Sequence, residues 1–125
     1  MATFVAAMAL VAPLPSPVMS PRVLELECSG ACARRVQHLK RRAHKRRVVR
    51  PYRAWLRRVA QCESGNRWGI STGNGFHGGM QFTISSWRAV GGRGMPHHAS
   101  QLEQSYRAVR LLKLQGPGAW PVCAR

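Results

Sequence analysis

The chain has 125 residues, enough for one domain with tails, and carries a formal net charge of +16 from 20 Lys and Arg against 4 Asp and Glu. This balance favours a polyanionic partner, such as a nucleic acid, an acidic membrane surface or an anionic cell wall. Asp is absent, which excludes aspartate-based metal sites and restricts carboxyl chemistry to Glu25, Glu27, Glu63 and Glu103.

Residues 1–21 begin with an apolar run and continue with a proline-rich stretch. The apolar run is too short to span a bilayer, which takes about 20 residues, but it has the length of a signal-peptide core. A basic segment in front of it is missing. We interpret residues 1–21 as an export signal, with a disordered proline-rich N-terminus as the alternative.

Residues 22–51 lead into a strongly basic run. Twelve Lys or Arg and no acidic residue lie between Arg34 and Arg58. We expect a helical or disordered basic arm outside the folded core, ended by Pro51. Its functional interpretation is attachment to anionic wall polymers or lipid headgroups, and a merely solvated surface is the alternative. Nucleic acid is disfavoured, because no aromatic side chains for base stacking are interleaved with residues 34–51.

The chain contains four cysteines: Cys28, Cys32, Cys62 and Cys123. An even number in a short chain fits two disulfides and an oxidising compartment, so we expect a secreted or cell-wall-associated protein. Zinc is the competing interpretation, since His38 and His44 follow the first Cys pair. Their spacing is too short, because a two-Cys, two-His finger needs about 12 residues between the pairs. We therefore expect neither a metal nor another cofactor.

The region 52–125 has the pattern of a folded domain. Trp55, Leu56 and Val59 recur at helical spacing and predict an amphipathic helix over residues 52–62. Six glycines follow between residues 65 and 79, which indicates tight turns. Residues 80–90 then predict a short helix closed by a pair of glycines.

The last helix is marked by a capping box at Ser100 and Glu103. In such a box the Ser hydroxyl accepts a hydrogen bond from the third helical N–H, and the Glu side chain reaches back to the backbone N–H of the Ser. Gly116 stops the helix. Because no strand pattern is longer than a turn, we expect a mainly helical domain.

Glu63 follows Cys62 directly and precedes the glycine-rich stretch. The aromatic, amide and hydroxyl side chains around it suit a sugar-binding cleft; they include Trp68, Thr72, Asn74, Phe76 and Gln81. A carboxyl group held against apolar surface has a raised pKa and can donate a proton near neutral pH. Glu63 is therefore the candidate general acid, with an ordinary solvated Glu as the alternative.

Four segments stand in a fixed order along the globular region: VAQCESG (59–65), STGNGFHGGMQF (71–82), Ser86-Trp87 and GAWPVC (118–123). In order and spacing they resemble the catalytic domain of the resuscitation-promoting factors and related transglycosylase-like proteins of actinobacteria. The resemblance implies a small, compact, mainly α domain of the α+β lysozyme-like superfamily. Its glycine-rich loop would line a substrate groove.

The resemblance also assigns residues. Glu63 takes the place of the general acid, while Gln81 and Ser86 take positions that line the groove beside it. A disulfide between Cys62 and Cys123 is implied as well.

Two departures from the family pattern concern activity rather than fold. Phe76-His77 stands where two tyrosines are usual. Arg67 follows closely after Glu63, and it would lower the pKa of the acid if the two side chains paired.

The implied function is cleavage of peptidoglycan at the β-1,4 bond between N-acetylmuramic acid and N-acetylglucosamine, by a lytic transglycosylase or a muramidase. Glycosidases with two carboxyl groups hold them about 5–9.5 Å apart. Since Glu103 is assigned to the helix cap, we expect Glu63 to act alone, with the 6-hydroxyl of the muramic acid as nucleophile. The alternative is a non-catalytic cationic protein that binds the wall or another polyanion through a degenerate lysozyme-like domain. In either case we expect a monomer.

Overall fold

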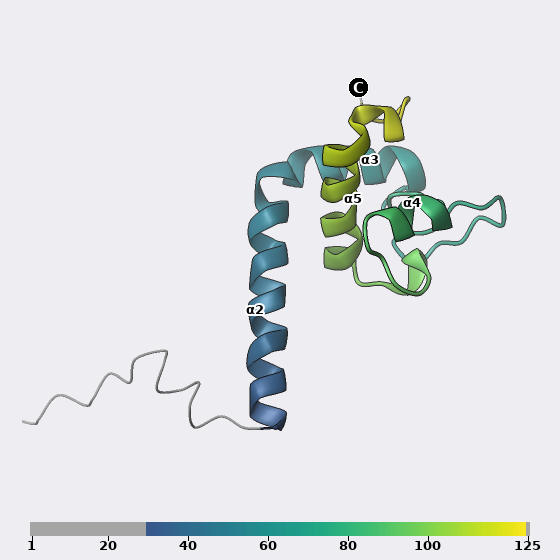
Figure 1. The fold of residues 1–125 in the computed structure, drawn as a ribbon. Coiled ribbons are helices and arrows are strands. Elements are labelled where there is room, and N and C mark those ends of the chain that lie inside the picture. The colour runs from purple at the N-terminus through teal and green to yellow at the C-terminus, as the bar shows by residue number, and fades with distance from the viewer. Residues whose placement is uncertain (1–29, 125) are drawn as a thin grey trace, which may run out of the picture. The chain divides into compact units, whose positions relative to one another are not determined.

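A computed structural model describes residues 30–124 of the chain (Figure 1). The expected export signal at 1–21, Glu25, Glu27 and Cys28 lie outside the described residues. The helices, in chain order, are α2 (Ala31–Val49), η1 (Arg50–Tyr52), α3 (Arg53–Ser64), α4 (Ile84–Ala89), η2 (Pro96–His98), α5 (Gln101–Gln115) and η3 (Pro117–Ala119). Between residues 30 and 124 the only β pairing is a pair of isolated antiparallel bridges, Ser71 to His77 and His77 to Phe82. The expectation of a mainly helical domain is confirmed.

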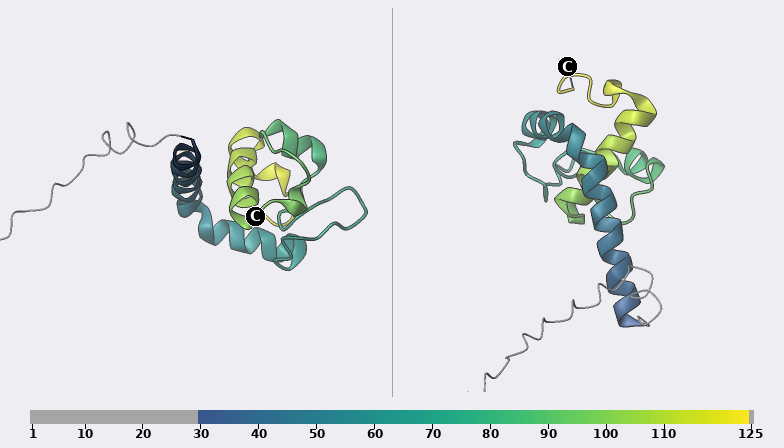
Figure 2. Two further views of the ribbon diagram at one scale, coloured as in Figure 1. Left: turned by 90° about the horizontal axis from the view of Figure 1, so that it is seen from below. Right: turned by 90° about the vertical axis from the view of Figure 1, so that its left-hand side faces the viewer.

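The core belongs to the compact unit that begins at Val36. Its fully buried side chains include Val59 of α3, Trp87 of α4 and Val109 of α5. Met80 and Phe82 bring the loop between α3 and α4 into the same core. Burying an apolar side chain of this size stabilises by about 1.5–3 kcal/mol, so the loop is fixed to the helices by its own residues. In Figures 1 and 2, α5 lies between α2 and α4.

Helix α3 extends two residues beyond the predicted end, which places Glu63 inside the helix. Gly65 ends it in the left-handed conformation, with φ 61, and donates its N–H to the carbonyl oxygen of Gln61 at 3.0 Å, while the N–H of Asn66 donates to that of Ala60 at 3.1 Å. This geometry is typical of a glycine that follows a helix C-terminus.

Helix α4 is shorter than the predicted range 80–90. It begins only after Thr83, whose hydroxyl accepts a hydrogen bond from the backbone N–H of Ser86. The preceding residues form a tight turn instead, because His77 and Phe82 exchange two backbone hydrogen bonds of 2.9 Å. Met80 and Phe82 are apolar because they are buried in this turn.

Helix α5 begins as predicted, since the Ser100 hydroxyl accepts a hydrogen bond from the N–H of Glu103 at 3.2 Å. The prediction that the Glu103 side chain reaches back to the backbone N–H of Ser100 is wrong. The carboxylate of Glu103 accepts hydrogen bonds from the ammonium group of Lys45 and from Nε of Arg107. Bonds between charged groups are stronger than one to a neutral N–H, which explains why the Glu103 side chain turns away from Ser100.

The basic arm is helical, and α2 ends before Pro51 as expected. It does not lie wholly outside the core, however. Val49 is buried, and the ring of His44 packs edge-on against Tyr106 of α5 with centroids 5.9 Å apart. Together with the Lys45–Glu103 ion pair, these contacts hold the C-terminal part of α2 on α5. No helix within residues 30–124 is both long and apolar enough to cross a bilayer.

Candidate active site

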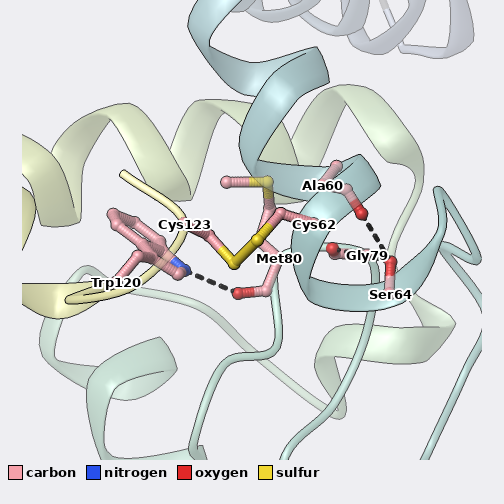
Figure 3. Close-up of a disulfide and its surroundings, with 7 residues drawn as sticks. All are labelled: Ala60, Cys62, Ser64, Gly79, Met80, Trp120 and Cys123. Atoms are coloured by element: carbon pink, nitrogen blue, oxygen red, sulfur yellow. Dashed lines mark hydrogen bonds between the residues drawn. A yellow bond between two sulfur atoms is a disulfide. The ribbon is translucent and has the colours of Figure 1, made fainter. Parts of the chain in front are cut away.

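Both chain neighbours of Glu63 are anchored. The hydroxyl of Ser64 donates to the carbonyl oxygens of Ala60 at 3.1 Å and Gly79 at 2.8 Å. Cys62 forms a disulfide with Cys123 across 61 positions of sequence, as Figure 3 shows. The implied Cys62–Cys123 pairing is confirmed, and the backbone that carries Glu63 is held from both sides.

The C-terminal segment closes over the same region. The indole N–H of Trp120 donates to the carbonyl oxygen of Met80 at 2.8 Å (Figure 3). The Trp120 ring also packs edge-to-face against Trp55 and Phe82, at centroid distances of 5.3 Å and 6.3 Å. Helix α3, the loop around Met80 and the C-terminal segment are thus fixed together beside Glu63.

The carboxyl group of Glu63 is half-buried and makes no hydrogen bond or ion pair within residues 30–124. It lies one helical turn beyond Val59, which is fully buried, so both side chains lie on one helix face. Burial raises the pKa of Glu63 above its ordinary value. A group with a raised pKa and no cationic partner retains its proton to higher pH, as a general acid must.

Arg67 does not pair with Glu63. Its Nε donates to the carbonyl oxygen of Ser64 at 2.9 Å. That carbonyl belongs to the last turn of α3, where carbonyl groups lack partners within the helix and attract basic side chains. The pairing that would have lowered the pKa of the acid is therefore not formed.

Thr72, Asn74 and Phe76 share the exposed loop between Ser71 and His77, which projects from the body of the domain in Figures 1 and 2. The Thr72 hydroxyl contacts Asn74 Oδ1 and the carbonyl oxygen of Phe76. Asn74 Oδ1 also accepts from the N–H of Phe76 at 3.3 Å. These bonds give the loop a defined shape, and Phe76 is 41% exposed as a residue.

Gln81 and Ser86 lie on the turn before α4 and on α4 itself. Gln81 has a φ of 50, in the left-handed region that a non-glycine residue adopts only at a cost, and its Nε2 donates to the carbonyl oxygen of Gly78 at 2.9 Å. The Ser86 hydroxyl donates to the carbonyl oxygen of Thr83 at 3.0 Å. Within the described residues neither side chain is hydrogen-bonded to Glu63, so their place in a groove stays a prediction.

Trp68 is partly buried against the core. Its ring packs so closely on Gly79 that a Cβ atom there would lie 2.6 Å from ring atoms. The ring also lines a cavity whose walls come from α2, α3 and α5. The predicted contact of Trp68 with a sugar stays a prediction, because its packing does not test it.

Sequence reasoning missed Gln104, which is fully buried on α5. Its Oε1 accepts from the N–H of Gly79, and its Nε2 donates to the carbonyl oxygens of Trp68 and Ala99, each at 2.9 Å. Gln104 thereby fixes the glycine turn beside the end of α3. The available signal was a polar residue in the apolar stripe of the helix, at helical spacing from Ala108.

Three histidines cluster beside the glycine-rich loop. His97 stacks on His77 with centroids 5.2 Å apart, and it contacts His98 at 4.2 Å. Desolvation, followed by the charges of His98 and His77, lowers the pKa of His97. No group of His, Cys, Asp and Glu within residues 30–124 has an arrangement that could hold a metal ion.

Known proteins share the sequence of the folded region. The transglycosylase-like domain family matches residues 51–123. Resuscitation-promoting factor Rpf of Micrococcus luteus is 62% identical over 68 residues, which cover 54% of this chain and 30% of that protein. Resuscitation-promoting factor RpfE of Mycobacterium tuberculosis is 54% identical over 67 residues, which cover 54% of this chain and 39% of that protein.

The chain belongs to the transglycosylase-like domain family. Its domain is of the resuscitation-promoting-factor type, which confirms the resemblance seen in the sequence. The matched segment spans 30% and 39% of the length of these two relatives. The similarity is thus to one domain of longer proteins.

Proposed function

We propose that this chain cleaves the glycan strands of peptidoglycan at the β-1,4 bond between N-acetylmuramic acid and N-acetylglucosamine, with Glu63 as the general acid. The observation that carries the proposal is the half-buried carboxyl group of Glu63, which has a raised pKa and no partner within residues 30–124. Its anchored neighbours Cys62 and Ser64 support it. Membership of the transglycosylase-like domain family supports this activity.

In this proposal Glu63 works without a second carboxylate. Glu103 is neutralised by Lys45 and Arg107, so it is unsuited to act as nucleophile or base. Glu63 gives its proton to the glycosidic oxygen as the bond to C1 of the muramic acid breaks. The 6-hydroxyl of the same sugar then bonds to C1 and passes its proton to the Glu63 carboxylate. The products are a 1,6-anhydro end and a free 4-hydroxyl, and Glu63 is again protonated.

We propose that the substrate contacts come from the loop and turn residues beside the acid. The exposed ring of Phe76 offers an apolar face to a sugar. The neutral polar groups proposed to hydrogen-bond the glycan are Thr72, Asn74, Gln81 and Ser86. Trp68 is the second proposed aromatic contact.

The rest of the chain fits a protein that works outside the cell. We propose that residues 1–21 direct export, that residues 22–51 form a basic arm, and that residues 52–125 form the catalytic domain of a secreted or wall-associated monomer. The arm would attach the enzyme to anionic wall polymers or lipid headgroups, which its large excess of Lys and Arg over Glu25 and Glu27 supports.

Digestion of purified peptidoglycan tests the function. The full chain should release soluble fragments with anhydro ends by mass spectrometry, whereas reducing ends would indicate hydrolysis by water. Glu63→Gln should release at least about 100-fold less, the smaller end of general-acid contributions. Equal release by the two proteins would exclude the proposed role of Glu63.

The non-catalytic alternative makes a different prediction. A binder would be retained on insoluble peptidoglycan through the basic run Arg34–Arg58, would release no fragments, and would be indifferent to Glu63→Gln. Retention that survives neutralisation of that run would count against this alternative.

A further inference from the structure

A cavity of about 560 Å³ lies where the C-terminal half of α2 meets α3 and α5. The candidate acid Glu63 does not line it. Pockets that bind small ligands are typically about 300–1,000 Å³. Part of its wall comes from Arg42, Arg46 and Val49 of α2, which precede the residues matched by the family. The cavity is therefore a feature of this chain and not of the catalytic domain alone.

The charged wall is made of arginine. Arg42 and Arg46 of α2 face the cavity together with Arg53 and Arg57 of α3, and no acidic residue lines it. The ion pairs within residues 30–124 join Glu103 to Lys45 and Arg107 and involve none of these four. Like charges one helical turn apart destabilise a helix, and both helices carry such a pair. An anion in the cavity would remove this repulsion.

A hydroxyl group also lines the cavity. Ser105 is only 6% exposed and lines the cavity. Within the described part of the chain its hydroxyl makes no hydrogen bond to another residue. An acceptor bound in the cavity would give this hydroxyl a hydrogen-bond partner within the site.

The remaining wall is apolar. Leu56, Leu102 and the Trp68 ring line the cavity beside the arginines. A ligand that fills the site thus needs an anionic group and an uncharged part that packs against these side chains.

We propose that this cavity binds a phosphate ester, with the phosphate among the arginines and the ester substituent against Trp68. The guanidinium fork matches phosphate and carboxylate oxygens. Four such groups offer more donors than the two oxygens of a carboxylate accept, whereas a phosphate monoester presents three unsubstituted oxygens. Because the site is concave, it suits a single phosphate group on a soluble molecule or polymer and not the flat surface of a bilayer. The proposal does not depend on the role of Glu63, which does not line the cavity, although Trp68 is shared with the proposed glycan contacts.

Isothermal titration of the full chain with phenyl phosphate and with inorganic phosphate tests the site. We expect saturable binding at one site, tighter for phenyl phosphate, and weaker at high salt. The variant Arg42→Gln/Arg46→Gln should weaken phenyl phosphate at least about tenfold, because it removes two charge-assisted bonds. Ser105→Ala should also weaken it, by a smaller factor.

The matched control is Arg41→Gln/Arg47→Gln. It removes the same charge from exposed positions of α2 that do not line the cavity, so it should change the affinity less than about twofold. Circular dichroism and melting temperature verify that both variants are folded. An equal loss of affinity for phenyl phosphate in the two double variants would mean that the anion is attracted diffusely by the charge of α2 and is not bound at a site. Absence of saturable binding, or binding to anionic lipid vesicles alone, would equally overturn the proposal.

Discussion

The hydroxyl of Ser64 donates to the carbonyl oxygen of Gly79 at 2.8 Å, across 15 positions of sequence. Gly79 also donates its N–H to the buried amide of Gln104. The end of α3, the glycine turn and α5 are thus joined through Gly79, directly beside Glu63. Only a glycine fits there, because a Cβ atom would lie 2.6 Å from the Trp68 ring. The position of the candidate acid therefore depends on three separate elements.

Replacing Gln104 by Leu should destabilise the domain by at least about 1–3 kcal/mol, the cost of leaving one buried polar group unpaired. The N–H of Gly79 and the carbonyl groups of Trp68 and Ala99 would lose their partner. Urea unfolding at neutral pH measures the change. Gln115→Leu, at an exposed position of the same helix, is the control and should change stability by less than about 0.5 kcal/mol. Similar stability of the two variants would contradict the role given to Gln104.

Contacts between elements that are far apart in the sequence limit what could be predicted from the sequence. Helices α3 and α5 follow from local spacing of apolar residues, and the Ser100 cap follows from a local motif. Gln104 could not be found this way, because its partners stand 36, 25 and 5 positions away. The same holds for Glu103, since its partner Lys45 lies 58 positions away in the sequence.

In the candidate site too, some features could be predicted from the sequence and others required the structure. Glu63 stands out in the sequence because acidic residues are scarce and the surrounding motif is specific. Its environment required the structure: Arg67 is close in the sequence, yet it caps the carbonyl of Ser64. The α4 prediction was too long because the apolar residues Met80 and Phe82 are buried in a turn, and burial in a turn and burial on a helix look alike in so short a run.

Removing the Cys62–Cys123 disulfide should destabilise the domain by about 2–5 kcal/mol, the usual loss for a small domain. In Cys62→Ala/Cys123→Ala the unfolded chain regains the freedom of a loop that spans 61 positions. Urea unfolding without reductant measures the loss. Cys32→Ala serves as the control, because Cys32 precedes the compact unit that begins at Val36. Equal stability of the double variant and the native chain would show that the disulfide contributes nothing.

Acid should loosen the contact between α2 and α5. Burial alone would raise the pKa of Glu103, but the hydrogen bonds from Lys45 and Arg107 outweigh it, so the pKa is lowered. Because the pKa is lowered in the folded state, the ionised Glu103 contributes stability that is complete above the ordinary pKa of 4.5. This contribution is lost as the pH falls through the lowered pKa of the folded state. Glu103→Gln should therefore cost about 1 kcal/mol at neutral pH, as expected for a partly exposed ion pair, and progressively less in acid.

Thermal unfolding of the native chain, Glu103→Gln, Lys45→Gln and the double variant between pH 7 and pH 3 measures this contribution. The double-mutant cycle isolates the pair from other effects of each change. A coupling between the two side chains that is the same at both ends of this range would contradict the assigned pKa.

Glu63→Gln should abolish activity and yet stabilise the fold at neutral pH. Because burial raises the pKa of Glu63 in the folded state, its ionisation is harder in the folded than in the unfolded chain. The protonated Glu63 therefore contributes stability that is complete below the ordinary pKa of 4.5. This contribution is lost as the pH rises through the pKa of Glu63 in the folded state. Gln carries no charge at any pH, so the variant escapes this loss.

The melting temperature of Glu63→Gln should thus exceed that of the native chain at pH 7, and the difference should shrink as the pH falls toward 4. Glu103→Gln provides the opposite case, because it should melt below the native chain at pH 7. A Glu63→Gln variant that melts below the native chain at pH 7 would mean that the carboxylate has a stabilising partner. Its pKa would then be lowered, and Glu63 would be poorly suited to donate a proton at neutral pH.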